Sequence, residues 1–423
     1  MNLCKTAPIL LLSFMLLTLE ACGERQLSRQ TVERVLRASW QSYRQQFISP
    51  AGRVQIPERD GGTISEAQAY ALLRAVWAAD AATFARVYAW TQANLSRPDH
   101  LLAWQWGRRA DGSWGVLDAN TASDGDLDYA LALVLAAARG WRAPPGLPDY
   151  QSEARQARAA IWKKEVVALP AGARILTPGN WHEAEPPYLL NPSYFSPAAY
   201  HLFAKLYGEQ PPPAVPGQAR APALHSSSPL RWQGRGWGES VGTVLEPAWD
   251  RLHQDTYRLL ASLNEGLDNP GVGLFPDWCR IDAQGLLSQA TGRETRFGWE
   301  AVRLPWRLAL DHLWFKEPLA AQILGQKFLP FFRQEWQSRG KLPALYNFAG
   351  TLAADYESPV LYAGVLAAAL VAEDRDFARQ MAEKIFSFYH EKDGRAYFVS
   401  PDNYYANNWA WLGLALYAGW VKP

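Results

Sequence analysis

Three segments far apart in this 423-residue chain share one pattern. They begin at Asp111, Asp282 and Asp393, and each runs from an acidic turn through a short extended stretch and a polar loop into a helix that contains Leu-Ala-Leu. Helical periodicity also dominates elsewhere, and very short connections join adjacent helices, as in helical hairpins. A recurring unit of this kind favours six hairpins closed in a ring, an (α/α)6 barrel.

Twelve helices are predicted, and strand-like alternation is sparse, so we expect an all-α fold with short extended segments in the cleft-side loops. The predicted helices span 31–47, 66–79, 81–95, 125–139, 150–166, 196–207, 243–263, 301–314, 317–337, 357–372, 374–389 and 406–420. In such a barrel the loops that enter the inner helices share one face. Residues at those helix starts are therefore expected to lie close together.

One domain is expected over residues 23–423. Within it, residues 208–242 are rich in proline, glycine and serine and do not fit a regular helix. Helical patterns of the same kind continue on both sides of this segment. We therefore interpret it as a surface excursion between two barrel helices and not as a linker between domains.

Residues 1–22 are typical of a bacterial export signal, because Lys5 is followed by an apolar stretch too short for a comfortable membrane span. The signal ends in "LEAC", which resembles a lipobox with Cys22 as the lipidated residue. Glu20 is unusual in a lipobox, and cleavage near Ala21 without lipidation is the alternative. We expect an exported protein, either a cell-envelope lipoprotein that meets the membrane only through its anchor or a periplasmic or secreted protein.

The composition narrows the possible partners. A net charge of +1 argues against a nucleic-acid binder, whereas 20 tryptophans suit both a large core and a sugar-binding cleft. Once the signal is removed, Cys279 is the one cysteine left besides Cys22, which excludes a disulfide scaffold and a cysteine-based metal site. The seven histidines show no ligand spacing. We therefore expect a monomer with no metal and no organic cofactor.

Acidic residues stand at the start of three predicted helices. Glu66 falls in a first helical turn under either of two capping-box patterns, which begin at Thr63 and Ser65. Asp124 and Glu300 open two further helices. A single acid at such a position commonly caps the helix or complements its dipole. Three of them, each in a stretch rich in tryptophan or tyrosine, indicate a carboxylate site.

Four sequence blocks resemble, in order, those of glycoside hydrolase family 8. They are "GGTISEAQAYALLRAV" at 61–76, "ASDGDLDYALALVLAAARGW" at 122–141, "NPSYFSPAAYHLF" at 191–203 and "GWEAVRLPWRLALD" at 298–311. The resemblance implies an (α/α)6 barrel that hydrolyses internal β-1,4-glycosidic bonds with inversion, most often in cellulose-type glucan. Chitosan, xylan and mixed-linkage glucan are alternative substrates, and a weakly active or non-catalytic glycan-binding protein is the alternative function.

The resemblance also implies the catalytic residues. It makes Glu66 the general acid, Asp124 the residue that holds the reactive sugar and its developing charge, and Glu300 the general base. Family members more often have aspartate at the base position, so Asp277 in "GLFPDW" is kept as an alternative base. An inverting enzyme needs its two carboxyl groups about 6.5–9.5 Å apart, so that a water molecule fits between the base and the sugar.

Four further residues are implied to bind substrate or support the base. Tyr194 is expected beside the reactive sugar ring, Trp104 in the cleft, and Tyr70 in contact with substrate. Arg303 is expected to orient the base and keep it ionised. The sequence leaves Trp106 open between the cleft and the core.

Overall fold

The computed structural model describes residues 27–208, 248–267 and 272–423. Apart from three short 3-10 turns, it contains twelve helical segments in these residues, when the consecutive elements α9, η4 and α10 are taken as one run. Each overlaps a predicted helix, so the all-α prediction is confirmed. The predicted signal with Cys22 and most of the 208–242 excursion lie outside the described residues.

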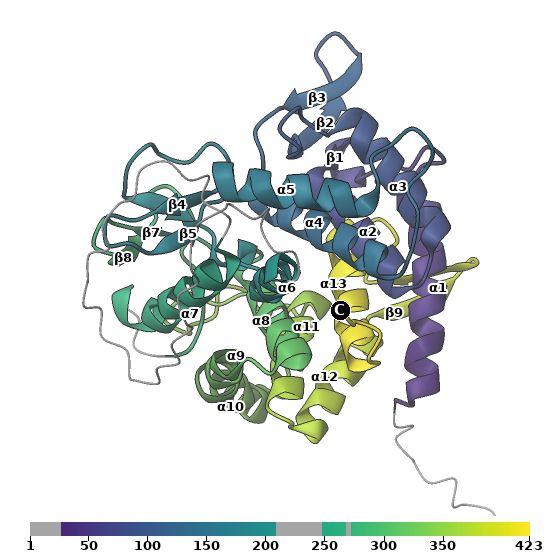
Figure 1. The fold of residues 1–423 in the computed structure, drawn as a ribbon. Coiled ribbons are helices and arrows are strands. Elements are labelled where there is room, and N and C mark those ends of the chain that lie inside the picture. Colours follow the sequence, from purple (N-terminus) through teal and green to yellow (C-terminus); the bar gives the residue numbers. More distant parts are fainter. Residues whose placement is uncertain (1–26, 209–247, 268–271) are drawn as a thin grey trace, which may run out of the picture.

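Six helices form the inner wall of the barrel (Figure 1). They are α2 (Ser65–Trp77), α4 (Ser123–Ala138), α6 (Pro197–Gly208), α8 (Leu304–Phe315), α11 (Pro359–Val371) and α13 (Tyr404–Tyr417). Each inner helix contacts the next one in this order, and α13 contacts α2. This closed ring is the predicted (α/α)6 barrel.

The remaining helices form the outer layer. They are α1 (Arg29–Phe47), α3 (Ala81–Asn94), α5 (Tyr150–Lys164), α7 (Trp249–Gly266), the run of α9 (Pro318–Gln322), η4 (Ile323–Phe328) and α10 (Leu329–Arg339), and α12 (Arg375–Ser387). Each of them except α1 follows an inner helix and packs against it, whereas α1 packs against α13. The chain therefore runs through the barrel as successive inner–outer hairpins.

Burial distinguishes the two layers. In the outer helix α1 the buried side chains include Val32, Val35, Leu36 and Ser39, a spacing that gives one apolar face. In the inner helix α11 every residue except Leu370 is buried. A helix that is apolar on all sides is stable only when other helices surround it. The sequences of the helices thus determine which layer each one joins.

Short strands lie in the loops before the inner helices. The sheets are β1 (Thr63–Ile64) with β2 (Gln105–Arg108) and β3 (Trp114–Asp118), β4 (Val166–Ala168) with β5 (Arg174–Leu176), β6 (Tyr188–Leu190) with β7 (Cys279–Ile281) and β8 (Leu287–Gln289), and β9 (Tyr389–Lys392) with β10 (Arg395–Phe398). All pairings are antiparallel. The hairpins β2–β3, β7–β8 and β9–β10 turn at Asp111, Asp282 and Asp393, and each precedes an inner helix, which confirms the sequence repeat.

None of the helices in the described part of the chain is long and apolar enough to cross a lipid bilayer.

Candidate active site

Side-chain capping is present at some helix starts of the barrel, including the inner helices α11 and α13, and absent at others. Several outer helices are capped by a side chain that accepts a backbone N–H of the first turn, namely those of Ser28, Asp80, Asp149 and Asp374. The N-cap residues of α2, of α4 and of the short 3-10 turn η3 (Ala301–Arg303) before α8 make no such side-chain bond. The Glu66 and Glu300 side chains are therefore not used as caps, whereas Asp124 Oδ1 accepts the Gly125 amide in the first turn of α4.

Both predicted capping boxes at the start of α2 are wrong. Thr63 lies in strand β1, and the buried Ser65 hydroxyl has no hydrogen-bond partner among the described residues. The side chain of Gln68 turns into the interior, where it accepts from the Val54 amide and donates to Thr91. Tertiary contacts have replaced the local capping pattern, and the Glu66 carboxylate is free for another partner.

That partner is Arg303, which binds all three predicted catalytic acids. Its Nη1 donates to Glu66 Oε2 at 2.5 Å and to Asp124 Oδ2 at 3.0 Å. Its Nη2 donates to Glu300 Oε2 and, at 2.9 Å, to Ser193 Oγ. The structure thus brings together, on one buried guanidinium, acids from the starts of three different inner helices.

A glycine allows two of these helix starts to approach. A Cβ on Gly125 would lie 2.4 Å from Ser65 Oγ and 3.0 Å from the Glu66 amide nitrogen, which is closer than packed atoms come. Any side chain at this position would push α4 away from α2. Gly125 therefore brings Asp124 and Glu66 within reach of the same arginine.

A second arginine lies one helical turn along α8. Both terminal nitrogens of Arg307 donate to the two carboxylate oxygens of Asp128, at 2.6 and 2.7 Å. Both residues are buried, and such a two-bonded pair has a fixed geometry. This pair ties α8 to α4 beneath the acids and fixes the position of Arg303 relative to Asp124.

Glu300 has a second side-chain partner besides Arg303. Asn191, from the residues before the 3-10 turn η2 (Pro192–Tyr194), donates from Nδ2 to Glu300 Oε2 at 3.0 Å. The Glu300 side chain is 33% exposed, whereas that of Glu66 is 13% exposed. Of the two acids, Glu300 is therefore the one that is open to water.

Asp277, the alternative base, has a structural role. It is 4% exposed, and its Oδ1 accepts the backbone N–H groups of Gly298, Glu300 and Ala301 at 3.0, 3.1 and 2.7 Å. These bonds hold the turn that presents Glu300. An oxygen that already accepts three N–H groups is poorly placed to take a proton from water, so we correct its assignment from alternative base to support of Glu300.

Electrostatics favour the protonated form of Glu66. Burial, together with the nearby carboxylates of Asp124 and Glu300, raises its pKa to about 8, although Arg303 acts in the opposite direction. Burial also raises the pKa of Asp124. Three carboxylates around one cation leave excess negative charge, and a proton bound by these carboxyl groups reduces that charge. Glu66 can therefore hold a proton at neutral pH.

An aromatic pocket of about 310 Å³ opens beside these acids. Its lining includes Trp104, Trp181, Trp278, Tyr194 and Arg293. Pyranose rings present flat patches of C–H, which pack on aromatic faces. The predicted positions of Trp104 and Tyr194 are consistent with this pocket, because both residues line it. The Arg303 guanidinium carbon also lies over the Tyr194 ring, 5.3 Å from the ring centre.

Tyr70 lies elsewhere than predicted. It is 1% exposed, its ring meets Trp409 edge to face, and its hydroxyl lies 3.5 Å from Arg303 Nη1. A sugar cannot reach a ring so enclosed, so we correct its role from substrate contact to support of Arg303. Trp106, which the sequence left open, is buried and stacks on Trp114.

Three residues of this site were missed by sequence reasoning. Asn191 opens the "NPSYF" block, so that block could have pointed to it. Trp181 and Trp278 lie in irregular loops, where no hydrophobic periodicity distinguishes a cleft residue from a core residue. Only the folded arrangement places them in one pocket.

Part of the chain matches a known protein family. Residues 19–212 match the family model described as "Glycosyl hydrolases family 8". An endoglucanase of Pseudomonas fluorescens (strain SBW25) is 37% identical over 172 residues, which cover 39% of this chain and 42% of that protein. The matched region therefore spans less than half the length of this curated relative.

Two solved structures share the fold over most of the chain. One is the endo-1,4-D-glucanase from Vibrio fischeri ES114, with a TM-score of 0.64 and 23% identity over 90% of this chain and 94% of that one. The other is the β-1,3-1,4-glucanase from Paenibacillus sp. X4, with a TM-score of 0.70 and 18% identity over 93% of each chain. The barrel, the order of the four sequence blocks and the match over residues 19–212 agree, and in that part of its sequence the chain is similar to glycoside hydrolase family 8.

Proposed function

We propose that this protein hydrolyses internal β-1,4-glycosidic bonds of a cellulose-type glucan with inversion at the anomeric carbon. The observation that carries the proposal is the binding of Glu66, Asp124 and Glu300 to the one guanidinium of Arg303, beside an aromatic pocket. The endoglucanase name of the Pseudomonas relative supports the choice of substrate class.

Glu66 is proposed as the general acid. Its pKa, raised to about 8, keeps a proton on the carboxyl group at neutral pH. In the reaction this proton passes to the glycosidic oxygen as the bond from that oxygen to the anomeric carbon breaks. General acid catalysis of this kind contributes about 10²–10⁴-fold to the rate.

Glu300 is proposed as the general base, because it is the more exposed of the two acids and is held at one oxygen by Arg303 and Asn191. Its carboxylate takes a proton from a water molecule, whose oxygen attacks the anomeric carbon from the face opposite the leaving group. The guanidinium of Arg303 lies between Glu66 and Glu300 and binds one oxygen of each carboxyl group.

Asp124 is proposed to stabilise the positive charge that develops on the sugar ring. It is buried, and it lies so close to Tyr194, which lines the aromatic pocket, that burial and the charge of Asp124 together raise the pKa of the Tyr194 hydroxyl. Its Oδ1 accepts the Gly125 amide at 2.8 Å and its Oδ2 accepts from Arg303, so the carboxylate cannot swing away. A fixed negative charge at this place favours an oxocarbenium-like transition state.

A mixed-linkage glucan is the second candidate substrate, because the Paenibacillus neighbour carries the name β-1,3-1,4-glucanase. The deciding experiment measures reducing-sugar release from carboxymethyl-cellulose, mixed-linkage glucan, chitosan and xylan, with the Glu66→Gln variant as control. The proposal expects the highest rate on cellulose or mixed-linkage glucan and none from the variant. Binding of a glycan without hydrolysis would identify a non-catalytic glycan-binding protein instead.

We also propose that the chain is exported and lipid-anchored at Cys22, on the strength of the "LEAC" pattern and the preceding apolar stretch. Metabolic labelling with a fatty acid should mark the wild type and not Cys22→Ser. Equal labelling of both would exclude Cys22 as the anchor, and soluble wild-type protein without label would indicate ordinary signal cleavage.

A further inference from the structure

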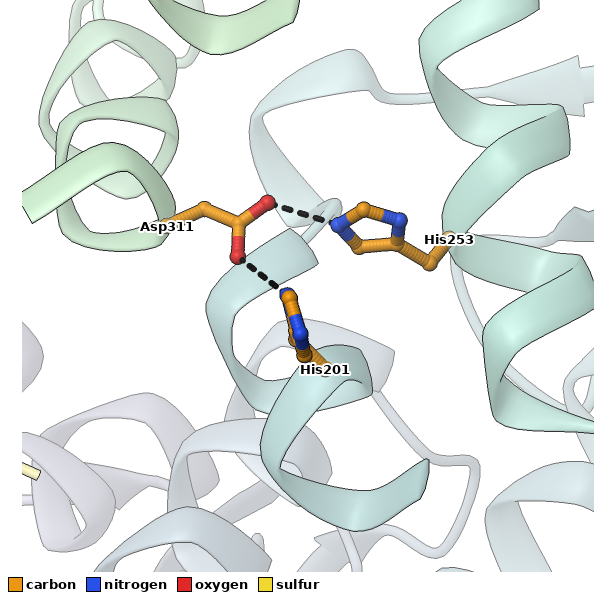
Figure 2. Close-up of side chains that lie close together, drawn as sticks. All are labelled: His201, His253 and Asp311. Atoms are coloured by element: carbon orange, nitrogen blue, oxygen red, sulfur yellow. Dashed lines mark hydrogen bonds and ion pairs between the residues drawn. The ribbon is translucent and has the colours of Figure 1, made fainter. Parts of the chain in front are cut away.

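Two histidines and an aspartate meet on the side of the barrel formed by three successive helices. His201 comes from α6, His253 from α7 and Asp311 from α8. His201 Nδ1 lies 3.3 Å from Asp311 Oδ1, and His253 Nε2 lies 2.6 Å from Asp311 Oδ2. Figure 2 shows both imidazole rings directed at the same carboxylate.

This cluster is separate from the candidate active site. Asp311 follows Arg303 by eight residues along the same helical direction, which at 1.5 Å per residue is a rise of about 12 Å. Asp311 is fully buried, and its hydrogen-bond partners His201, His253 and Tyr257 are different residues from those bound to Arg303. The proposed hydrolysis leaves the cluster without a role.

The sequence did not predict such a cluster. The seven histidines are far apart along the chain, and no pair has the spacing of metal ligands on one helix. The fold packs α6, α7 and α8 together, and this packing brings His201 and His253 to the carboxylate of Asp311. The expectation of no metal rested on spacing alone, which does not detect ligands that come from three helices.

The three potential ligand atoms are close enough to share one ion. All lie within 4.8 Å of one another. A tetrahedral zinc ion with bonds of about 2.0–2.1 Å holds its ligand atoms about 3.3 Å apart, so shifts on the order of 1 Å would suffice. Imidazole nitrogens with carboxylate oxygens suit zinc, whereas calcium and magnesium prefer oxygen ligands alone.

A second carboxylate, that of Glu317, lies beside His253. Glu317 Oε2 is 3.9 Å from His253 Nε2, while the other oxygen of Glu317 accepts the Leu319 amide at the start of α9. With Glu317 the set becomes two nitrogens and two oxygens. Four protein ligands without a place for water are the mark of a structural zinc site.

The surroundings hold the ligands in place. The Tyr257 hydroxyl donates to Asp311 Oδ2 at 2.8 Å, and the His201 ring stacks on Phe315 with ring centres 4.2 Å apart. Hydrogen bonds and packing of this kind fix the orientation of metal-binding side chains. Without an ion the same groups form a hydrogen-bonded network around Asp311, which is the competing role.

We propose that His201, His253 and Asp311, with Glu317 as the fourth ligand, bind a structural zinc ion that joins α6, α7 and α8. The ion ties the inner helices α6 and α8 to the outer helix α7. Its binding stabilises the folded barrel, because the unfolded chain cannot present the four groups together.

The test uses the untagged full chain, since a polyhistidine tag would bind zinc itself. The protein is stripped with a chelator, incubated with zinc chloride and freed of loose metal by gel filtration. We expect one zinc ion retained per chain, measured by mass spectrometry of the metal, and a thermal midpoint higher than that of the stripped protein.

Matched variants separate this site from adventitious binding. His201→Gln and His253→Gln keep a hydrogen-bond donor for Asp311 but remove the imidazole ligand, and we expect both to lose the retained zinc and the thermal shift. His390→Gln, at an exposed histidine in β9, should keep both. No retained zinc in the wild type, or equal retention in all four proteins, would overturn the proposal.

A measurement on the wild type covers the case in which the variants fail to fold. Cobalt(II) added to the stripped protein should give the intense visible absorption of a tetrahedral site, and zinc should abolish it by displacement. A weak octahedral spectrum, or none, would mean that the cluster is a hydrogen-bonded network only.

Discussion

Arg303 and Glu66 are 237 residues apart in the chain, and Arg303 Nη1 lies 2.5 Å from Glu66 Oε2. The same nitrogen donates to Asp124, which places two acids from neighbouring inner helices on one side of the guanidinium. Glu300 binds the other terminal nitrogen. The candidate site is therefore organised around an arginine, and its behaviour should follow from the charges on that arginine's partners.

Replacement of Glu66 by glutamine should lower the hydrolysis rate by about 10²–10⁴-fold, because an amide accepts the bond from Arg303 but cannot donate the acid proton. The control is Glu58→Gln, at an exposed glutamate before the same helix, which should leave the rate unchanged. Initial rates on the preferred glucan and circular dichroism check the two variants. A folded Glu66→Gln protein with near-normal activity would exclude Glu66 as the acid.

The pH dependence of kcat/KM should show an alkaline limb near pH 8. Glu66 must be protonated to act, and its raised pKa, about 8, means that the active form is lost as the pH rises through that value. Asp124 contributes to this elevation through its negative charge. Asp124→Asn should therefore move the limb to lower pH, besides reducing the rate, and a limb that stays in place would contradict the assignment.

The same pKa makes a prediction about stability. Because the folded-state pKa of Glu66 is raised above its ordinary value of 4.5, its contribution to the free energy of unfolding is fully present below that value. The contribution is lost as the pH rises towards about 8. Urea unfolding of the wild type should thus lose stability relative to Glu66→Gln between these two pH values, and a constant difference would argue against the elevated pKa.

Arg303→Met should destabilise the protein by about 3–5 kcal/mol at neutral pH, because it leaves buried carboxylates without their cation. Arg303→Lys should cost less, since it keeps the charge but loses the two-sided donor geometry. Urea unfolding measures both. The penalty in Arg303→Met should shrink at acidic pH, where the carboxylates are protonated, and a penalty independent of pH would point to lost packing instead.

Asp277→Asn distinguishes support of the turn from base catalysis. The asparagine oxygen can still accept the amides of Gly298, Glu300 and Ala301, so we expect most of the activity to remain. Asp277→Ala removes the acceptor and should lower both the thermal midpoint and the rate. If a stable Asp277→Asn protein lost its activity, Asp277 would have to be assigned as the general base.

The helices were predictable because periodicity is a local property of the sequence. The all-round apolar character of α11 and the single apolar face of α1 even indicate their layers. The capping boxes at Thr63 and Ser65 were not realised, because Gln68 found partners 14 and 23 residues away that no local pattern contains. The burial of Tyr70 could not be predicted either, because the residues that cover it, such as Trp409, are distant in the sequence.

The acids were found through the blocks that contain them, but their common partner was not. The sequence places Arg303 near Glu300 but does not indicate that Arg303 also binds Glu66 and Asp124, which come from other helices. The tryptophans at 181 and 278 and the cluster of His201, His253 and Asp311 are likewise products of the closed ring. Contacts between residues of different hairpins could not be predicted from the sequence, because they form only when the barrel is folded.

Glu300→Asp tests whether the site has adapted to the longer base. Glutamate reaches about 1.5 Å further than aspartate, and a displacement near 1 Å costs on the order of 10²-fold in rate. Because Asn191 and Arg303 hold the Glu300 carboxylate where it is, we expect aspartate to be slower. A faster Glu300→Asp enzyme would show that glutamate is the poorer base here, and unchanged rates in both Glu300→Asp and Glu300→Ala would exclude Glu300.

The central claim is that Glu66 and Glu300 act on opposite faces of the scissile bond, with a water molecule as the nucleophile. Proton NMR of the first products formed from a β-1,4-linked oligosaccharide tests it most directly, before mutarotation mixes the anomers. The account predicts that the α-anomer appears first. A β-anomer appearing first would mean that configuration is retained through a covalent intermediate, and the assignment of Glu300 as base to a water molecule would be contradicted.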